Sequence, residues 1–246
     1  MIHLLKFLIG LLFLLYACKL DIEARIVPNR IWKYMLAILL PFLIVEFIFY
    51  KYTVENLVFA VLQLGMMAAL AYVFYLVGAY GGADAKALIV ISILFPIYPF
   101  YSIFPILNKG VGIFAFSTLT NSVIVAPAIL LLVFIKNVTK EGIGNIKNNL
   151  LYYFVGYRVE IDSIPKFHNL LEFFDESGKF VRVKRSVEPN EELLRRLKEY
   201  GPRKGIKKVW VTPALPFIVF ITFGYFLAFV VGDILYFLIS LLIRSI

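Results

Sequence analysis

The chain has 246 residues, of which 61% are hydrophobic and only 17% are charged. An ordinary soluble domain carries roughly 25% charged residues, so these figures exclude a soluble globular protein and predict a polytopic membrane protein. The net charge of +9 does not predict nucleic-acid binding, because most of it lies in one segment that membrane orientation explains better. The single cysteine, Cys18, excludes an internal disulfide framework.

Six apolar segments approach the length of helix that crosses a bilayer, which is about 20 residues. They cover residues 2–20, 31–50, 54–77, 85–107, 111–135 and 213–243. The fourth segment contains Pro96, Pro99 and Pro105, which predict a kink or an early end. The sixth begins with Pro213 and Pro216, so its helix is expected to start a few residues later. The predicted fold is an all-α polytopic membrane protein with six transmembrane helices.

A polar insert separates the fifth and sixth segments. Residues 136–210 hold 16 of the 25 Lys and Arg residues and 10 of the 16 acidic residues, so this insert is too polar to span a membrane. Two alternating runs around the turn 175-DESG-178 predict a β-hairpin over 170–185. Residues 191–201 predict a short helix that Gly201 closes, and 150–161 predict a helix end and a strand. The insert is therefore expected to be a small α+β soluble domain before the last helix.

The arrangement of basic residues predicts the orientation in the cell membrane. The loop between the first two spans is basic, and with six spans it lies on the same side as the insert. Basic loops face the cytoplasm, so both termini are expected outside. The expected parts are five transmembrane helices, a cytoplasmic insert and a last transmembrane helix, over residues 1–135, 136–210 and 211–246.

Acidic side chains near the membrane are the candidate functional residues, because a charge within a span is costly. Glu46 and Asp233 lie within predicted spans, where a proton site and a structural hydrogen-bonding role are both open. Asp21 follows the first span and Asp84 opens the fourth, so each alone fits a solvated helix end or a helix cap. The topology places Asp21 and Asp84 at similar depth on one side. Two close carboxylates cannot both ionise easily and can share one proton, as in aspartic proteases.

Other catalytic chemistry has little support in the sequence. His3 and His168 have no Cys or acidic partner at metal-ligand spacing, so no metal is expected. The chain contains no G-x-S-x-G elbow for a nucleophilic serine. It also contains no G-x-x-x-x-G-K-[ST] loop for phosphate binding. An acid–base mechanism that requires no cofactor is the prediction that remains.

Three short runs resemble motifs of type IV prepilin and archaeal preflagellin peptidases, which are intramembrane aspartyl proteases. The run 21-DIEARIVPN-29 resembles the segment after the first span, where an aspartate precedes a Pro-Asn pair. The run 81-GGAD-84 resembles the G-x-G-D motif, although Ala83 stands where the strict motif has glycine. The run 213-PALPF-217 resembles the Pro-Ala-Leu motif of presenilin-like members. The order of these features and the insert before the last span resemble the archaeal preflagellin branch.

The resemblance implies an endopeptidase that removes the N-terminal signal peptide of preflagellin or pilin-like precursors at the cytoplasmic membrane face. Asp21 and Asp84 would be its catalytic residues. The residues implied on the substrate side are Gly81, Gly82, Pro213, Ala214 and Leu215. Glycines would let the substrate backbone come close, and the prolines would leave backbone groups free for an extended substrate.

Two alternatives from other functional classes stay open. Glu46 and Asp233 would suit a proton- or cation-coupled transporter, although no repeat relates the two halves of the chain. A non-catalytic assembly factor could instead use the insert, whose net charge is +6, to hold acidic lipid head groups or a partner.

Overall fold

The computed structural model describes residues 2–50, 52–78, 81–99, 106–214 and 216–244. The chain divides into two compact units, which are described separately. The first unit comprises Met1–Ala126 and Pro216–Ile246, and the second comprises Pro127–Leu215. The second unit contains the polar insert predicted at 136–210.

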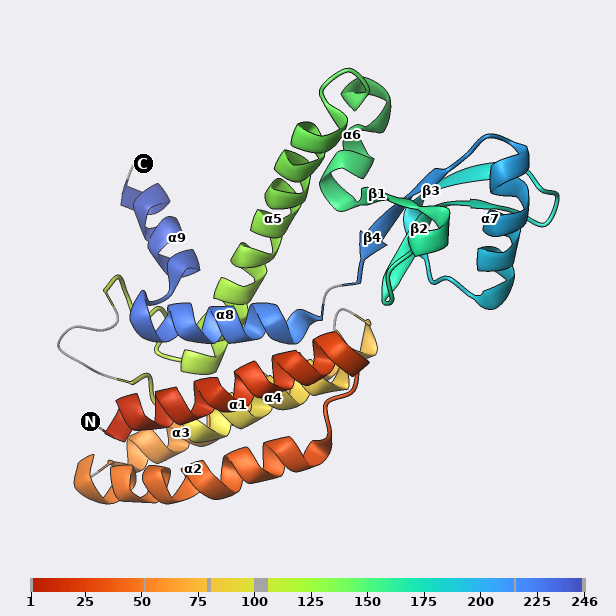
Figure 1. Ribbon diagram of the computed structural model, residues 1–246. Helices are drawn as coiled ribbons and strands as arrows, with labels where there is room; N and C mark the ends of the chain where they lie inside the picture. The colour runs from red at the N-terminus through yellow and green to blue at the C-terminus, as the bar shows by residue number, and fades with distance from the viewer. Residues whose placement is uncertain (1, 51, 79–80, 100–105, 215, 245–246) are drawn as a thin grey trace. The chain divides into compact units, whose positions relative to one another are not determined.

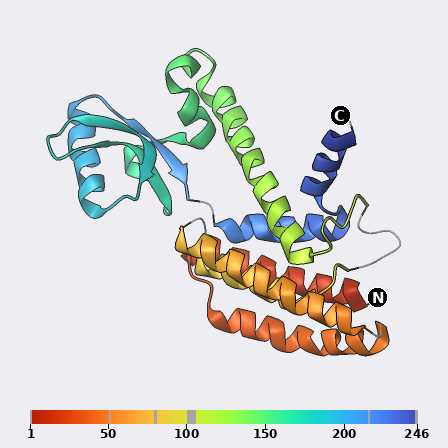
Figure 2. The same cartoon turned by 180° about the vertical axis from the view of Figure 1, so that it is seen from behind.

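The first unit is a helix bundle, coloured from red to yellow and dark blue in Figures 1 and 2. Helix α4 (Gly82–Leu94) contacts α3 (Val54–Leu76), α2 (Asn29–Tyr50) and α8 (Phe217–Val230). Helix α1 (Ile2–Ala24) packs against α2 and α8. The core lies between these helices and includes Leu14, Met35, Ile91 and Tyr225, each fully buried. The end of α1 and the start of α4 lie at the same end of the bundle (Figures 1 and 2).

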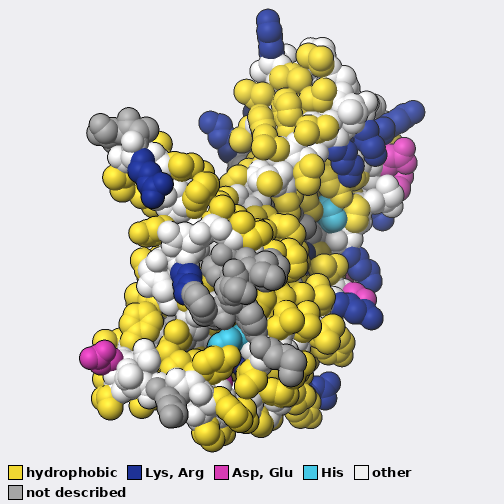
Figure 3. All heavy atoms as spheres, turned by 90° about the vertical axis from the view of Figure 1, so that its left-hand side faces the viewer, with side chains coloured by type: hydrophobic (Ala, Val, Ile, Leu, Met, Phe, Trp, Pro, Cys, Tyr) yellow, Lys and Arg dark blue, Asp and Glu magenta, His cyan; other side chains and the backbone are white. Residues whose placement is uncertain are grey.

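Hydrophobic side chains also cover much of the outer surface (Figure 3), as expected for helices surrounded by lipid. Within the described residues, four helices are long and apolar enough to cross a membrane, namely α1, α2, α3 and α5 (Phe114–Glu141). Helices α8 and α9 (Ile234–Arg244) would form a fifth span if the pair, bent by 60°, counts as one. A multi-pass membrane protein is therefore supported, whereas six spans are not confirmed.

The predicted fourth span differs most from expectation. Helix α4 has 13 residues and ends at Leu94, two residues before Pro96. A proline cannot donate to the helical ladder and disfavours helical geometry in the residue before it. The early end that the prolines predict is confirmed, but a helix of this length is too short to cross a bilayer. Pro105 lies outside the described residues.

The predicted sixth span is wrong as a continuous helix, because α8 stops at Val230 and the chain turns at Gly232 with φ +110°. Polar groups of α5 satisfy the broken backbone: Asn121 Nδ2 donates to Gly232 O at 2.8 Å, and its Oδ1 accepts the Ile234 N–H at 3.0 Å. Asp233 Oδ1 accepts the Tyr236 N–H at 2.9 Å and thereby caps α9. The contacts of Asp233 support its structural interpretation.

Small residues allow close helix contacts within the bundle. A Cβ on Gly224 of α8 would lie 2.2 Å from Ser122 Oγ and 2.3 Å from Thr118 O of α5. Gly10 of α1 would likewise clash with the Tyr225 hydroxyl, at 2.5 Å. Helix α5 therefore comes close to α8 at Gly224, and α1 comes close to α8 at Gly10.

The second unit is an antiparallel four-stranded sheet in the order β1-β4-β2-β3. The strands are β1 (Tyr157–Glu160), β2 (His168–Phe174), β3 (Phe180–Val187) and β4 (Lys208–Pro213). The predicted hairpin is confirmed as β2 and β3. The predicted helix is α7 (Glu191–Arg203), which continues two residues past Gly201, and a short 3-10 turn covers Ile161–Ser163.

Both faces of this sheet are covered by helices. Val209 and Val211 pack in a core with Leu197 of α7, whereas Trp210, which points to the opposite face, packs with Tyr152 and Tyr153. These tyrosines belong to α6 (Ile146–Val155), which confirms the helix end predicted before β1. The insert is thus a three-layer α+β unit.

Candidate active site

Asp84 occupies the first turn of α4 and is only 4% exposed. Its Oδ2 accepts the backbone N–H of Gly81, the residue that caps the helix, at 2.8 Å. Its Oδ1 is buried and accepts no hydrogen bond from the residues that the structure describes. The helix-capping interpretation is therefore confirmed in a modified form, because one oxygen serves the cap and the other is left available.

Asp21 lies in the last turn of α1 and is partly buried. Its backbone carbonyl accepts the Arg25 N–H at 3.0 Å, and Arg25 adopts a positive φ of 57° where the helix ends. The guanidinium of Arg25 acts electrostatically on the Asp21 carboxyl. The sequence places this charge four residues after the aspartate, beyond the apolar part of α1.

The end of α1, which carries Asp21, and the start of α4, which carries Asp84, lie at the same end of the bundle (Figures 1 and 2). Cys18, one turn before Asp21, is buried. Cys18 Sγ contacts α8, at 3.0 Å from Thr222 Oγ1 and 3.5 Å from Ile218 O. That the two carboxyls act as a pair stays a prediction.

Comparison with known proteins identifies the family. Residues 8–130, which include both aspartates, match the model of the type IV leader peptidase family. The chain belongs to the type IV leader peptidase family. Residues 148–234 also match the family model described as Archaeal Peptidase A24 C-terminus Type II. Membership gives the protein a prepilin-type peptidase role.

Two relatives of this family member come from Methanocaldococcus jannaschii. One is a preflagellin peptidase, 24% identical over 238 residues that cover 93% of this chain and 94% of the relative. The other is an uncharacterized protein, 29% identical over 182 residues that cover 70% of this chain and 61% of the relative. The match to the preflagellin peptidase thus extends over both units.

The sequence did not indicate how the Pro-Asn pair of this leader peptidase is used. Lys86 of α4 donates from Nζ to Asn29 Oδ1 at 2.7 Å, so the start of α2 is linked to the first turns of α4. Lys86 lies two residues after Asp84. The Asn29 side chain therefore helps to hold the segment that carries one carboxyl, a role that motif spacing alone could not reveal.

Gly81 and Gly82 need no unusual backbone or space for the fold. Gly81 has φ −82° and ψ 169°, and a Cβ there would lie at an ordinary 3.5 Å from Asp84 Oδ2. A Cβ on Gly82 would lie 3.7 Å from Tyr75. A functional requirement for glycine at these positions would therefore come from outside the folded chain, which can be tested.

Gly81→Ala is expected to lower precursor cleavage about tenfold or more while leaving the free energy of unfolding within about 1 kcal/mol of wild type. The added methyl is accommodated by the fold but would obstruct a substrate backbone beside Asp84. Gly65→Ala in α3 is the matched control, because nothing lies within 4 Å of a Cβ there. Equal cleavage rates for Gly81→Ala, Gly65→Ala and wild type would remove Gly81 from the substrate site.

The predicted Pro-Ala-Leu residues belong to the other unit, and the start of the last helix is later than that motif. Pro213 is the last residue of β4, opposite His168 of β2. The Ala214 N–H donates to Phe167 O at 3.0 Å. This backbone group was predicted to be free for a substrate, and it is not. Leu215 lies outside the described residues. Helix α8 begins at Phe217, after Pro216 in the N-cap position.

Two further observations concern binding capacity. Within the described ranges, no three His, Cys, Asp or Glu side chains are grouped so that they could hold a metal ion. A cavity of about 390 Å³ is lined by residues of the insert, including Glu160, Asp162, Lys198 and Lys207. Neither aspartate contributes to its lining, so this cavity is not the site that the carboxyls define.

Proposed function

We propose that the protein is an intramembrane aspartyl endopeptidase that removes the N-terminal signal peptide of preflagellin or pilin-like precursors. The observation that carries this proposal is the environment of the Asp84 carboxyl. Its carboxyl is buried, is held through one oxygen, and has a second oxygen without a partner among the described residues. The name of the relative that matches along nearly the whole chain supports the substrate class.

The proposed reaction uses water and one shared proton. The ionised carboxyl takes a proton from water while the protonated carboxyl donates its proton to the scissile carbonyl, which gives a tetrahedral intermediate. Collapse of the intermediate breaks the C–N bond and transfers a proton to the leaving amine. In this scheme Asp84 Oδ1, which has no hydrogen-bond partner among the described residues, would accept a hydrogen bond from the water.

The proposed orientation places this chemistry at the cytoplasmic face. The basic loop after α1 and the insert would lie there, and both termini would lie outside. A precursor whose leader is still cytoplasmic while its apolar helix is in the membrane would present its cleavage site at that level. In this proposal the cytoplasmic insert covers residues from about 136 to about 210, between the transmembrane segments.

The proposed function predicts a pH and metal-ion profile. Purified protein is incubated with a precursor that carries a short basic leader ending in glycine, and the new N-terminus is sequenced. Cleavage is expected to decrease as the pH rises to about 9, because the pair then loses the proton it must donate. A metal chelator is expected to leave the rate unchanged. A flat profile through about pH 9, or abolition of cleavage by the chelator, would contradict the mechanism.

The transporter alternative has less support from the contacts. Glu46 pairs with Lys6 and lies 3.3 Å from His3 Nδ1, and Asp233 caps α9 and accepts the Ser117 hydroxyl at 2.7 Å. Both acids are thus engaged in interactions that hold helices together. These contacts account for the burial of both acids without a proton or cation path.

A further inference from the structure

The segment after α5 exposes apolar side chains next to lysines. Ile143, Leu150 and Leu151 are 72%, 52% and 44% exposed, and Lys140 and Lys147 are exposed beside them in the sequence. We call these five residues the basic-apolar surface. Figure 3 shows hydrophobic side chains gathered at the top of the view, where α5 ends and α6 begins, with Lys or Arg side chains at the margin.

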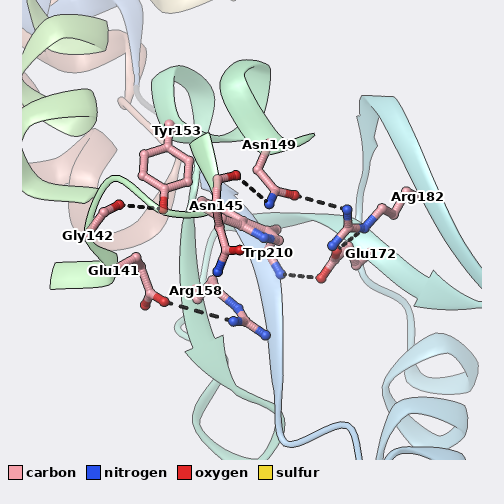
Figure 4. Close-up of polar contacts among 9 residues, drawn as sticks. All are labelled: Glu141, Gly142, Asn145, Asn149, Tyr153, Arg158, Glu172, Arg182 and Trp210. Carbon is pink, nitrogen blue, oxygen red and sulfur yellow. Dashed lines mark hydrogen bonds and ion pairs between the residues drawn. The ribbon is translucent and has the colours of Figure 1, made fainter. Parts of the chain in front are cut away.

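The opposite side of α6 packs against the sheet of the insert. Tyr152 and Tyr153 are buried against Trp210. The Tyr153 hydroxyl donates to Gly142 O at 2.9 Å, and Asn149 Oδ1 accepts from Arg182 at 2.9 Å (Figure 4). Arg182 in turn pairs with the buried Glu172 at 2.6 Å. These contacts keep the side chains of Leu150 and Leu151 facing outward.

Contacts with α5 place this surface close to where that helix leaves the bilayer. Helix α5 has 28 residues and extends about 42 Å, whereas the hydrocarbon core is about 30 Å thick. Its apolar sequence ends at Ile135, which is 57% exposed. Asn137 Nδ2 donates to Tyr153 O at 2.9 Å, and Phe134 stacks on Phe154 at 4.4 Å between ring centroids. Helix α6 therefore returns to the level of the last apolar turn of α5.

We propose that the basic-apolar surface docks on the bilayer, with Leu150 and Leu151 in the acyl boundary and Lys140 and Lys147 against anionic lipid head groups. A lysine near the surface of an anionic membrane is attracted to it, and exposed leucines gain from leaving water. Their continuity with the lipid-exposed end of α5 selects lipid as the occupant. The proposal is independent of the catalytic assignment, because it requires only that α5 spans the membrane.

Spin labels can test the depth of this surface in the full-length protein. Leu151→Cys and, as control, Glu176→Cys in the hairpin turn are labelled and reconstituted in vesicles of phosphatidylcholine with or without phosphatidylglycerol. Wild-type protein sets the background, because its one cysteine, Cys18, is buried. The label at 151 is expected to be accessible to oxygen and protected from a water-soluble nickel reagent. The label at 176 is expected to show the reverse.

The charge requirement is tested in the same vesicles. Lys140→Gln/Lys147→Gln is expected to lower the docked-to-undocked ratio about fivefold for each lysine in anionic vesicles, and to have little effect in phosphatidylcholine alone. Lys184→Gln/Arg185→Gln removes the same charge from β3 and is expected to change nothing. Equal nickel accessibility at positions 151 and 176 would overturn the proposal, and so would an equal effect of the two double variants.

Discussion

Asp84→Asn is expected to lower the rate of precursor cleavage at least about a thousandfold, because an amide can neither accept the proton of water nor donate one to a carbonyl. The fold is expected to survive. An asparagine retains a carbonyl oxygen that can accept the Gly81 N–H, which Asp84 Oδ2 accepts at 2.8 Å. The measurement is the initial cleavage rate in detergent or vesicles, together with the unfolding temperature of the same preparation.

Asp21→Asn is expected to have an effect of the same size, because the reaction needs both members of the pair. Glu23→Gln is the matched control: it removes one negative charge from the same helix end, two residues further on, where the side chain is exposed. This variant is expected to cleave at nearly the wild-type rate. Near wild-type cleavage by Asp21→Asn or Asp84→Asn would end the proposal, and inactive Glu23→Gln would show a general charge effect.

Local structure in the insert was predictable because its signals are short-range. In the hairpin turn, Asp175 Oδ1 accepts the N–H groups of Ser177 and Lys179, both at 2.9 Å, and Gly178 adopts φ +73°. The Ser177 hydroxyl and the Lys179 amide lower the pKa of the Asp175 carboxyl. All of these groups lie within five residues, so turn chemistry alone indicates the structure.

The break in the last predicted span could not be predicted in the same way. An apolar run over 213–243 favours one continuous helix, and a chain break in a membrane is costly unless its backbone groups find partners. The partner is Asn121, which bonds Gly232 O and the Ile234 N–H and lies more than 100 residues away in the sequence. Hydropathy detects the apolar run but carries no information about such distant contacts.

The candidate site also combines a feature that the sequence predicts with contacts that it does not predict. Span counting predicts Asp21 and Asp84 on one side, and the end of α1 and the start of α4 lie at one end of the bundle (Figures 1 and 2). The division of labour between the two oxygens of Asp84, and the link from Lys86 to Asn29, depend on how α1, α2 and α4 pack. Side-chain geometry at helix contacts is set by the whole core and not by a motif.

A buried charge cluster at the other end of α1 is the second feature that the sequence left open. Lys6 is completely buried and Glu46 is 1% exposed, and Lys6 Nζ pairs directly with Glu46 Oε2. Glu46 Oε1 lies 3.3 Å from His3 Nδ1 and accepts the Tyr52 hydroxyl at 2.5 Å. The Lys6 ammonium also lies 4.7 Å from the centre of the Phe95 ring. The cluster joins α1, α2 and the end of α4.

Glu46→Gln is expected to destabilise the protein by about 3–5 kcal/mol, because it leaves a lysine buried without its counter-charge. Lys6→Met is expected to cost a similar amount by leaving the carboxylate uncompensated. The double variant Lys6→Met/Glu46→Gln is expected to regain much of the loss, since neither charge is then buried alone. The measurement is unfolding in detergent micelles for all four proteins, which gives the coupling energy between the two positions.

Cleavage assays on the same variants separate a structural cluster from a proton or cation path. If the pair holds α1 in place, Glu46→Gln loses cleavage only at temperatures where it unfolds, and the double variant recovers both properties together. A transport site would instead lose function on neutralisation of Glu46 at unchanged stability, with Asp21 dispensable. Single variants as stable as wild type would show that the pair contributes nothing to the fold. Because α1 carries Lys6 at one end and Asp21 at the other, the cluster is expected to support the site through the stability of this helix.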